Sequence, residues 1–90
     1  MKLTRCASAG TDSREDAKVT VSPAESGIHI TVRSSVAPLF DRHIEAAARE
    51  LIDTYHIEAC SMEIDDRSAL DYALRARIET AILRATEEDT

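Results

Sequence analysis

Two short segments of the sequence hold side chains whose types and spacing could support chemistry. The adjacent carboxylates Asp65 and Asp66 have the residue type needed for general acid–base catalysis or for metal binding. They directly precede a stretch with helical periodicity, where acidic side chains can cap the helix and complement its dipole. We therefore interpret this pair as structural. In the second segment, Ser13 follows Asp12 in a polar stretch that contains Gly10 and has the composition of a turn or loop.

The histidines and cysteines show no catalytic or metal-binding pattern. Their spacing fits neither a Ser/His/Asp nor a Cys/His arrangement, and we expect no zinc site. The N-terminus lacks the apolar region of a secretory leader, and no run approaches the roughly 20 apolar residues of a membrane span. We therefore expect reduced thiols in a cytoplasmic protein. The residues concerned are His29, His43, His56, Cys6 and Cys60.

Size and charge favour a binding, carrier or subunit role. The 90 residues are enough for one small domain, residues 1–90, and the core must be aliphatic because the chain has one Phe, two Tyr and no Trp. The net charge of −6 arises in the second half, where residues 46–90 carry five basic and eleven acidic side chains. An acidic surface argues against a nucleic-acid partner, which needs a basic stripe. We interpret the acidic half mainly as a solvated face and secondarily as a docking face.

The alternation of apolar residues predicts an α+β fold in the order β-β-α-β-α. Segment 1–16 lacks sustained apolar periodicity and is expected to be flexible, as is the polar tail at 87–90. One-sided strands and helices predict a two-layer sandwich, in which two helices cover one face of a small, mostly antiparallel sheet. The first two strands are expected to be antiparallel neighbours. The predicted strands cover residues 17–21, 28–32 and 59–64, and the predicted helices run to about Tyr55 and from about Ser68 to Thr86.

Both predicted helices carry an apolar stripe along one face. Ser34 and Ser35 are candidate N-caps of the first helix, and Pro38 fits within its first turn. The stripe residues are Phe40, Ile44, Ala47, Ala48, Leu51 and Tyr55 in the first helix, and Leu70, Leu74, Ile78 and Ile82 in the second.

Two arginines of the second helix are expected to differ in their surroundings. Arg75 and Arg77 lie about 200° apart around the helix axis, since each residue turns it by about 100°. One of them could pair with Asp71 at i−4, and the other could face a partner subunit.

The C-terminal half resembles a known carrier family. Residues 64–71 read Ile-Asp-Asp-Arg-Ser-Ala-Leu-Asp and residues 75–77 read Arg-Ala-Arg, which is similar to the signature of citrate lyase acyl carrier subunits, the gamma chains. The sequence Ser-Ser-Val at residues 34–36 also matches. The acyl carrier subunit of malonate decarboxylase is a more distant likeness. The resemblance extends from Ala9 to about Ala85.

The resemblance implies a covalently attached prosthetic group. In the family, a serine within Ala-Gly-Ser/Thr-Leu-Glu-Ser-x-Asp carries phosphoribosyl-dephospho-coenzyme A through a phosphodiester bond. Residues 9–16 here read Ala-Gly-Thr-Asp-Ser-Arg-Glu-Asp, so a gapless match puts Arg14 at the modified position. A shift of one residue brings Ser13 into register, and we predict Ser13 as the attachment site. Ser8, Thr11 and an unmodified chain remain alternatives.

The function implied by the resemblance is that of a non-catalytic carrier in a citrate lyase complex. The group on the serine would hold acetyl and citryl thioesters. Its partners would be the alpha subunit, an acyl transferase, the beta subunit, a lyase, and the transferase that attaches the group. Neither nucleic acid nor a membrane is expected as a partner. The alternatives are the malonate decarboxylase carrier and an unmodified subunit that bridges larger proteins.

Overall fold

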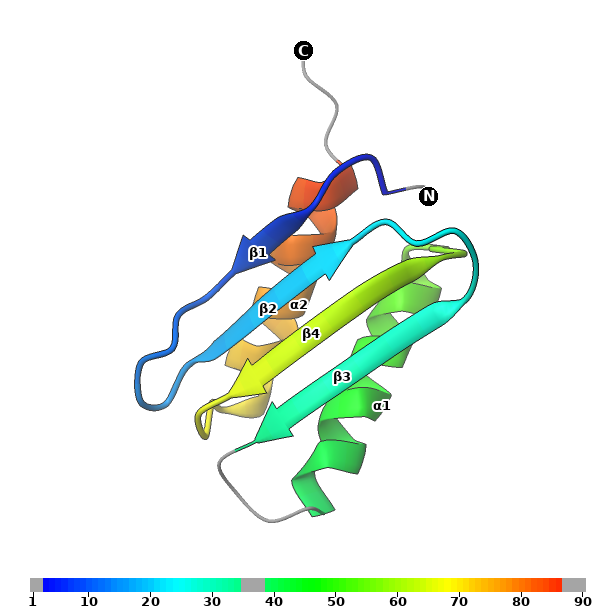
Figure 1. Ribbon diagram of the computed structural model, residues 1–90. Helices are drawn as coiled ribbons and strands as arrows, with labels where there is room; N and C mark the ends of the chain where they lie inside the picture. Colours follow the sequence, from blue (N-terminus) through cyan, green and yellow to red (C-terminus); the bar gives the residue numbers. More distant parts are fainter. Residues whose placement is uncertain (1–2, 35–38, 87–90) are drawn as a thin grey trace.

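A four-stranded mixed sheet and two helices make up the protein (Figure 1). The computed structural model describes residues 3–34 and 39–86. Both helices lie on one face of the sheet, where α2 packs against β1 and β2, and α1 packs beside β3. The predicted two-layer sandwich is therefore confirmed. The elements are β1 (Ala7–Ala9), β2 (Ala17–Ser22), β3 (Ile28–Ser34), α1 (Leu39–Thr54), β4 (Cys60–Asp66) and α2 (Asp71–Thr86).

The strand order in the sheet is β1-β2-β4-β3. β2 is antiparallel to both β1 and β4, whereas β3 is parallel to β4. The expectation that β2 and β3 are neighbours is wrong, because β4 lies between them. The helical connection through α1 allows β3 and β4 to pair in parallel. The central position suits β4, whose inward residues Cys60, Met62 and Ile64 are all buried, while the inward residues of β3 are only half-buried.

The N-terminal segment contains a strand that the sequence did not predict. β1 pairs with β2 through Ala7↔Val21 and Ala9↔Val19. Its three residues have small side chains, so they produce no recognisable apolar periodicity. The strand is also held from α2, because the Thr4 amide donates to the Ala85 carbonyl at 2.9 Å. Much of the segment expected to be flexible is thus part of the folded domain.

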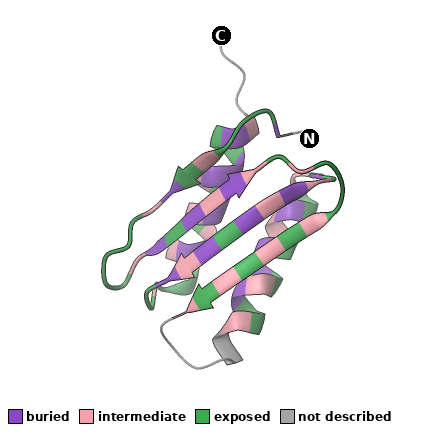
Figure 2. Ribbon diagram, viewed as in Figure 1, coloured by how far each residue is buried: buried purple, intermediate pink, exposed green. Residues whose placement is uncertain are grey.

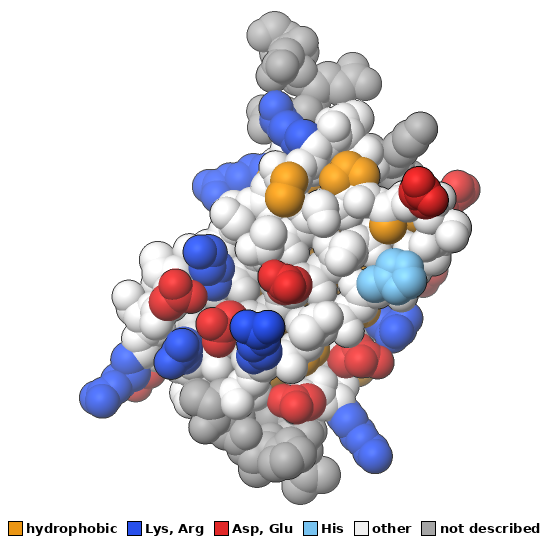
Figure 3. All heavy atoms as spheres, in the orientation of Figure 1, with side chains coloured by type: hydrophobic (Ala, Val, Ile, Leu, Met, Phe, Trp, Pro, Cys, Tyr) orange, Lys and Arg blue, Asp and Glu red, His pale blue; other side chains and the backbone are white. Residues whose placement is uncertain are grey.

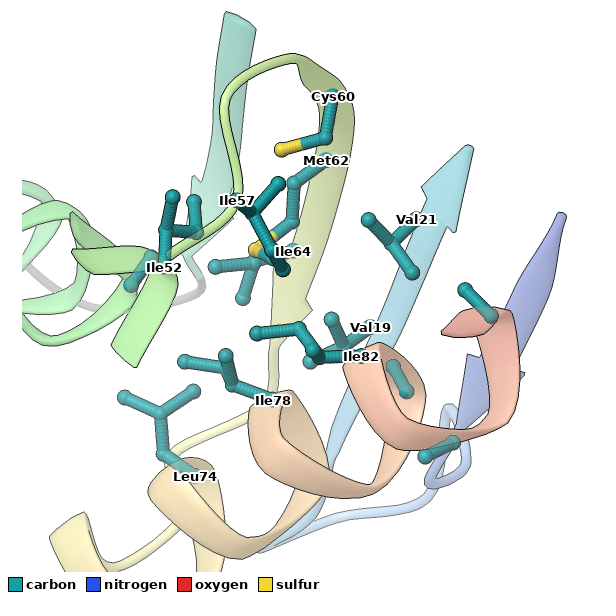
Figure 4. Packing of buried hydrophobic residues seen from close by; sticks show 14 of the residues in the cluster. Val19, Val21, Ile52, Ile57, Cys60, Met62, Ile64, Leu74, Ile78 and Ile82 are labelled. Carbon is teal, nitrogen blue, oxygen red and sulfur yellow. The ribbon is translucent and has the colours of Figure 1, made fainter. Parts of the chain in front are cut away.

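The core lies between the sheet and the helices, and its residues alternate along the strands (Figures 2 and 4). Each large aliphatic side chain that is fully buried contributes about 1.5–3 kcal/mol through removal from water. Leu74, Ile78 and Ile82 of the predicted α2 stripe are buried, but Leu70 is 61% exposed. The helix starts at Asp71 rather than Ser68, because Ser68 has a positive φ of 67° that a helix cannot contain. The largest fully buried side chains are Met62, Ile64, Ile78, Ile82, Val19, Val21 and Cys60.

The first helix also matches its predicted stripe in large part. Ile44, Ala47 and Ala48 are buried, and Leu51 and Tyr55 pack partly buried against the core. The prediction that Ser34 caps this helix is wrong, since Ser34 ends β3 and its hydroxyl donates to Asp66 Oδ2 at 3.4 Å. The other predictions for this region and for the chain end lie outside the described residues. They concern Ser35, Pro38 and the tail 87–90, while the side chain of Phe40 is likewise not described.

Candidate functional site

Residues 10–16, called the β1–β2 loop below, form the turn between the first two strands and carry Ser13 (Figure 1). Gly10 has a φ of +88°, and a Cβ there would lie 1.8 Å from the Ala17 carbonyl oxygen. Only glycine fits this position, where it fixes a turn at the end of β1. Glu15 also has a positive φ, 65°, near the start of β2. The loop therefore leaves and re-enters the sheet along a constrained path.

The Asp16 carboxylate holds this loop together. Its Oδ2 accepts hydrogen bonds from the hydroxyl of Thr11 at 2.6 Å and from the Thr11 amide at 3.1 Å. Its Oδ1 accepts from the Ala17 amide at 2.7 Å and from Arg77 Nε at 3.0 Å. The Thr11 hydroxyl, the Ala17 amide and the Arg77 guanidinium hold the pKa of Asp16 well below its usual range, because all of them stabilise the charged form.

A second connection at the same end of the sheet is made by backbone groups. The Glu15 amide donates to the Arg67 carbonyl at 2.7 Å, and the Arg67 amide donates to the Asp16 carbonyl at 2.9 Å. The β1–β2 loop is thus joined to the turn that follows β4. These two backbone hydrogen bonds and the Asp16 carboxylate fix the loop at its C-terminal end.

Ser13 lies between these fixed points and is exposed. Its amide donates to the Thr11 hydroxyl at 3.2 Å, and its carbonyl accepts from the Asp16 amide at 3.2 Å. Across residues 3–34 and 39–86, no hydrogen bond of the Ser13 hydroxyl is found. The backbone of Ser13 is therefore fixed while its hydroxyl is available for reaction.

The two other hydroxyl candidates have different surroundings. The hydroxyl of Thr11 already donates to Asp16 and accepts from the Ser13 amide. Ser8 lies within β1, opposite Thr20, and its carbonyl accepts a hydrogen bond from Arg84 at 2.8 Å. Reaction at Thr11 would break the loop contacts, and Ser8 belongs to a paired strand rather than a loop.

A shallow hollow adjoins the β1–β2 loop and is lined by Asp12, Arg14, Arg67 and Ser68. Arg14 is exposed, and Arg67 lies 3.4 Å from the Asp65 carboxylate. Figure 3 shows basic and acidic side chains interspersed over the sheet face that the helices leave open. The hollow brings two guanidinium groups near the loop that carries Ser13, together with the carboxylate of Asp12.

The carboxylates Asp65 and Asp66 do not form a catalytic pair. They are neighbours on a strand, so their side chains point to opposite faces of the sheet. Asp66 is buried, and its Oδ1 accepts from the Ala69 amide at 3.0 Å, which closes the turn before α2. A structural role is therefore confirmed for Asp66, but the predicted capping of the helix is wrong, because the bonded amide precedes α2. No cluster of three metal-ligating side chains occurs in the described part of the chain.

The remaining reactive residues serve local roles or are exposed. His43 Nε2 lies 2.8 Å from Asp71 Oδ1, and the His29 ring lies 3.1 Å from the Ser26 carbonyl. Both cysteines are free; Cys6 is exposed, and burial raises the pKa of the Cys60 thiol. Neither described helix has the length and apolar character needed to cross a membrane.

The two arginines of α2 are directed to different parts of the molecule. Arg75 Nε donates to Asp71 at 3.1 Å, which confirms the predicted i−4 pair, and its Nη1 also donates to Glu50 of α1 at 3.2 Å. Arg77 binds Asp16 within the same chain. Sequence reasoning missed the role of Asp16 and Arg77. The available signals were the final aspartate of the loop motif and the second arginine of Arg-Ala-Arg.

Comparisons with known proteins find relatives over nearly the whole chain. The family model described as malonate decarboxylase delta subunit (MdcD) matches residues 4–85. The chain is 43% identical to a citrate lyase acyl carrier protein of Haemophilus influenzae strain PittEE, over 98% of this chain and 92% of that protein. It is 40% identical to one of Rhodopseudomonas palustris strain BisA53, over 98% and 91%.

A solved structure shares the fold. One chain of a Pseudomonas malonate decarboxylase hetero-tetramer in complex with malonate superposes with a TM-score of 0.76 at 22% identity, covering 94% of this chain and 92% of that chain. Together these matches define a small acyl carrier class of protein. Within that class, the chain belongs to the family that includes the citrate lyase acyl carrier protein and the malonate decarboxylase delta subunit. The resemblance found in the sequence is confirmed.

Proposed function

We propose that this protein is the acyl carrier subunit of a citrate lyase complex and that Ser13 carries its prosthetic group. The observation that carries the proposal is an exposed serine hydroxyl, free of hydrogen bonds within the described residues, on a loop whose backbone is fixed. The chain has relatives named citrate lyase acyl carrier protein at 36–43% identity over nearly its whole length. A carrier of this kind catalyses nothing alone.

The loop geometry favours Ser13 over the other hydroxyls. The Thr11 hydroxyl is held by Asp16, and Ser8 is part of the paired strand β1. A modifying enzyme needs access to the reacting oxygen, and loop tips provide that access. Arg14, which a gapless match places at the modified position, has no hydroxyl to modify. It lies beside Ser13, where its charge can act on a neighbouring phosphate.

The residues around Ser13 fit a phosphodiester-linked group. Arg14 and Arg67 line the adjoining hollow, and guanidinium groups are well suited to phosphate oxygens. Arg14 and Arg67 would neutralise the phosphodiester, and the exposed position of Ser13 leaves the rest of the group in water. When attached, phosphoribosyl-dephospho-coenzyme A supplies a thiol that holds acetyl and citryl groups as thioesters. A tethered thiol meets both catalytic subunits at high effective concentration.

Attachment requires a second substrate, an activated phosphate anhydride of the group. The Ser13 oxygen attacks the phosphorus of the anhydride, and an oxygen–phosphorus bond forms. The bond from that phosphorus to the departing phosphate breaks, and the serine proton passes to a base of the transferase. The side chain of Ser13 is the only reacting group that this chain has to supply.

The proposed partners are the alpha and beta subunits of citrate lyase, in a cytoplasmic hetero-oligomer, together with the prosthetic-group transferase. The multi-subunit setting is supported by the malonate decarboxylase hetero-tetramer that contains the structural relative. That relative and the family description also favour a second candidate, the malonate decarboxylase carrier with a malonyl cargo. A gapless match to the family motif, which places Arg14 at the modified position, favours a third candidate, an unmodified bridging subunit.

The proposal is tested on protein produced together with its neighbouring genes. We expect an intact-mass increase equal to the group, located on Ser13 by peptide mapping, in wild type and in Ser8→Ala but not in Ser13→Ala. Ser13→Ala should also abolish activity of the assembled complex. An unmodified wild-type chain, in cells whose transferase modifies another carrier, would favour the bridging subunit. Acylation by malonate rather than citrate would favour the malonate decarboxylase carrier.

A further inference from the structure

We propose that Arg77 is a positioning residue for the modification of Ser13. Through the Asp16 carboxylate, Arg77 holds the β1–β2 loop in the shape in which the transferase recognises it. The inference rests on the proposed function of Ser13. It concerns a residue 61 positions from Asp16 along the chain, on a different element and outside the loop itself.

The contact between Arg77 and Asp16 supports a hydrogen-bonded ring within the loop from outside. The Thr11 hydroxyl and amide bind one oxygen of Asp16, so residues 11–16 form a ring that carries Ser13. Arg77 Nε and the Ala17 amide bind the other oxygen. With all four donors in place, the carboxylate cannot rotate without losing a hydrogen bond. Loss of the Arg77 guanidinium frees one side of the carboxylate and loosens the ring.

The stem of Arg77 also passes close to the start of the same loop. A Cβ built on Gly10 would lie 3.1 Å from Arg77 Cδ, so the arginine stem lies close against the glycine backbone. Arg77 therefore lies near both ends of the loop, with its stem beside Gly10 and its guanidinium bound to Asp16. Its position relates the start of the loop to its end.

A second arginine holds the strand that precedes the loop. Arg84 lies seven residues after Arg77, on the same side of α2, and its Nη1 donates to the Ser8 carbonyl at 2.8 Å. Arg5 Nε donates in turn to the Arg84 carbonyl at 2.8 Å. Helix α2 thus holds β1 through Arg84 and the loop through Arg77, which leaves Ser13 as the outward part of a fixed hairpin.

The geometry gives a prediction for the kinetics of attachment. If the loop has the correct shape for only a fraction of the time, its apparent affinity for the transferase falls to that fraction of the full value. Arg77→Met keeps the stem and removes the charge, so we expect the KM of the transferase for this carrier to rise on the order of tenfold while kcat stays unchanged. Arg77→Lys, which restores the charge, should recover part of the loss. Thr11→Val removes the hydroxyl that binds Asp16 but keeps the amide bond, so it loosens the ring from its other end and should act like Arg77→Met.

A matched control is available on the same helix. Arg75→Met removes an arginine two residues away that binds Asp71 and Glu50 but not the loop. We expect its attachment kinetics to match those of wild type. Amide hydrogen exchange provides a readout that does not depend on the transferase: the Thr11 amide should exchange faster in Arg77→Met and unchanged in Arg75→Met.

Three results would overturn the inference. Faster Thr11 exchange in Arg77→Met with unchanged attachment kinetics would show that the loop shape does not matter to the transferase. An equal rise of KM in Arg75→Met would assign the effect to general destabilisation. A KM of Arg77→Lys as high as that of Arg77→Met would remove the role of the charge. If wild type itself is not modified at Ser13, the proposed function fails, and this inference fails with it.

Discussion

Arg75 and Arg77 lie two residues apart on α2, and each donates to a carboxylate at about 3 Å, yet they stabilise different kinds of structure. Arg75 joins Asp71 and Glu50 on the open surface between the helices, where Asp71 is 52% exposed. Arg77 binds Asp16, which is only 16% exposed and also accepts two backbone amides and a hydroxyl. The first network links surfaces that core packing already holds together. The second shapes a loop that has no core of its own.

This difference shows that the surroundings of a carboxylate determine how much a bound arginine stabilises the structure. Exposed ion pairs are weak, because water solvates both charges well and salt screens them. A carboxylate that also accepts hydrogen bonds from amides and a hydroxyl cannot rotate freely. Each donor therefore helps to hold the carboxylate in position for the others. The pKa values follow this pattern. Hydrogen bonds from His43 and Arg75 lower the pKa of Asp71, and the hydrogen bonds of Thr11, Ala17 and Arg77 lower the pKa of Asp16 further.

Gly10→Ala should have the largest effect on stability, because it disrupts the loop frame directly. The new Cβ would meet the Ala17 carbonyl oxygen at 1.8 Å, at a φ of +88° that alanine rarely adopts. We expect the free energy of unfolding in urea to fall by about 3 kcal/mol or more. Gly27→Ala is the control: it has a φ of +77°, but its nearest contact is 3.6 Å. It should cost about 1 kcal/mol. Equal losses would show that the close approach at Gly10 is tolerated.

Asp16→Asn should have the next largest effect, and the effect should depend on pH. The folded pKa of Asp16 lies below its ordinary value of 3.8, so the charged form stabilises the fold above that pH. This stability is lost as the pH falls below about 4 toward the folded pKa. At pH 7 we expect Asp16→Asn to lower Tm by about 5 °C.

Thermal unfolding of Asp16→Asn and wild type between pH 2 and 7 measures this dependence. The difference in Tm should shrink as the pH falls below about 4, because protonation removes the same charge from wild type. Asp71→Asn, the exposed counterpart on α2, should show a smaller difference at every pH. A Tm difference between wild type and Asp16→Asn that is constant across the range would contradict the role given to the Asp16 charge.

Arg75→Met should have the smallest effect. Its two ion pairs are exposed, so we expect Tm to fall by less than about 2 °C and the remaining effect to vanish in high salt. Arg77→Met, measured beside it by calorimetry, should lower Tm more and retain part of the effect in salt. A larger loss for Arg75→Met would reverse the ranking of the two networks.

The parts of the fold set by local periodicity could be predicted from the sequence. Alternation along 17–21, 28–32 and 59–64 and the stripe of α2 led to the correct layers, because burial of one face dictates both patterns. The strand order could not be predicted, since local patterns do not specify which strand is central. β1 was missed because its stability comes from pairing with β2 and from contacts with α2, not from its own three residues.

The site divides in the same way. The pair of Arg75 with Asp71 could be predicted, because residues four apart on a helix are neighbours. The pair of Arg77 with Asp16 could not, because 61 residues separate them and only the folded sheet brings them together. The family motif indicated Ser13 only after a shift of one residue, because a gapless match places Arg14 at the modified position. The hydrogen bonds of Thr11 and the place of Ser8 in β1 supply the physical reasons for preferring it.

Peptide mapping of the carrier after reaction with its transferase tests the central claim most directly. The experiment compares wild type, Ser13→Ala, Ser8→Ala and Thr11→Val, with the modified residue located by fragmentation. We expect the phosphodiester-linked group on Ser13 in wild type and in Ser8→Ala, a slower reaction at the same residue in Thr11→Val, and no product in Ser13→Ala. A modified Ser13→Ala chain would contradict the assignment of the attachment site.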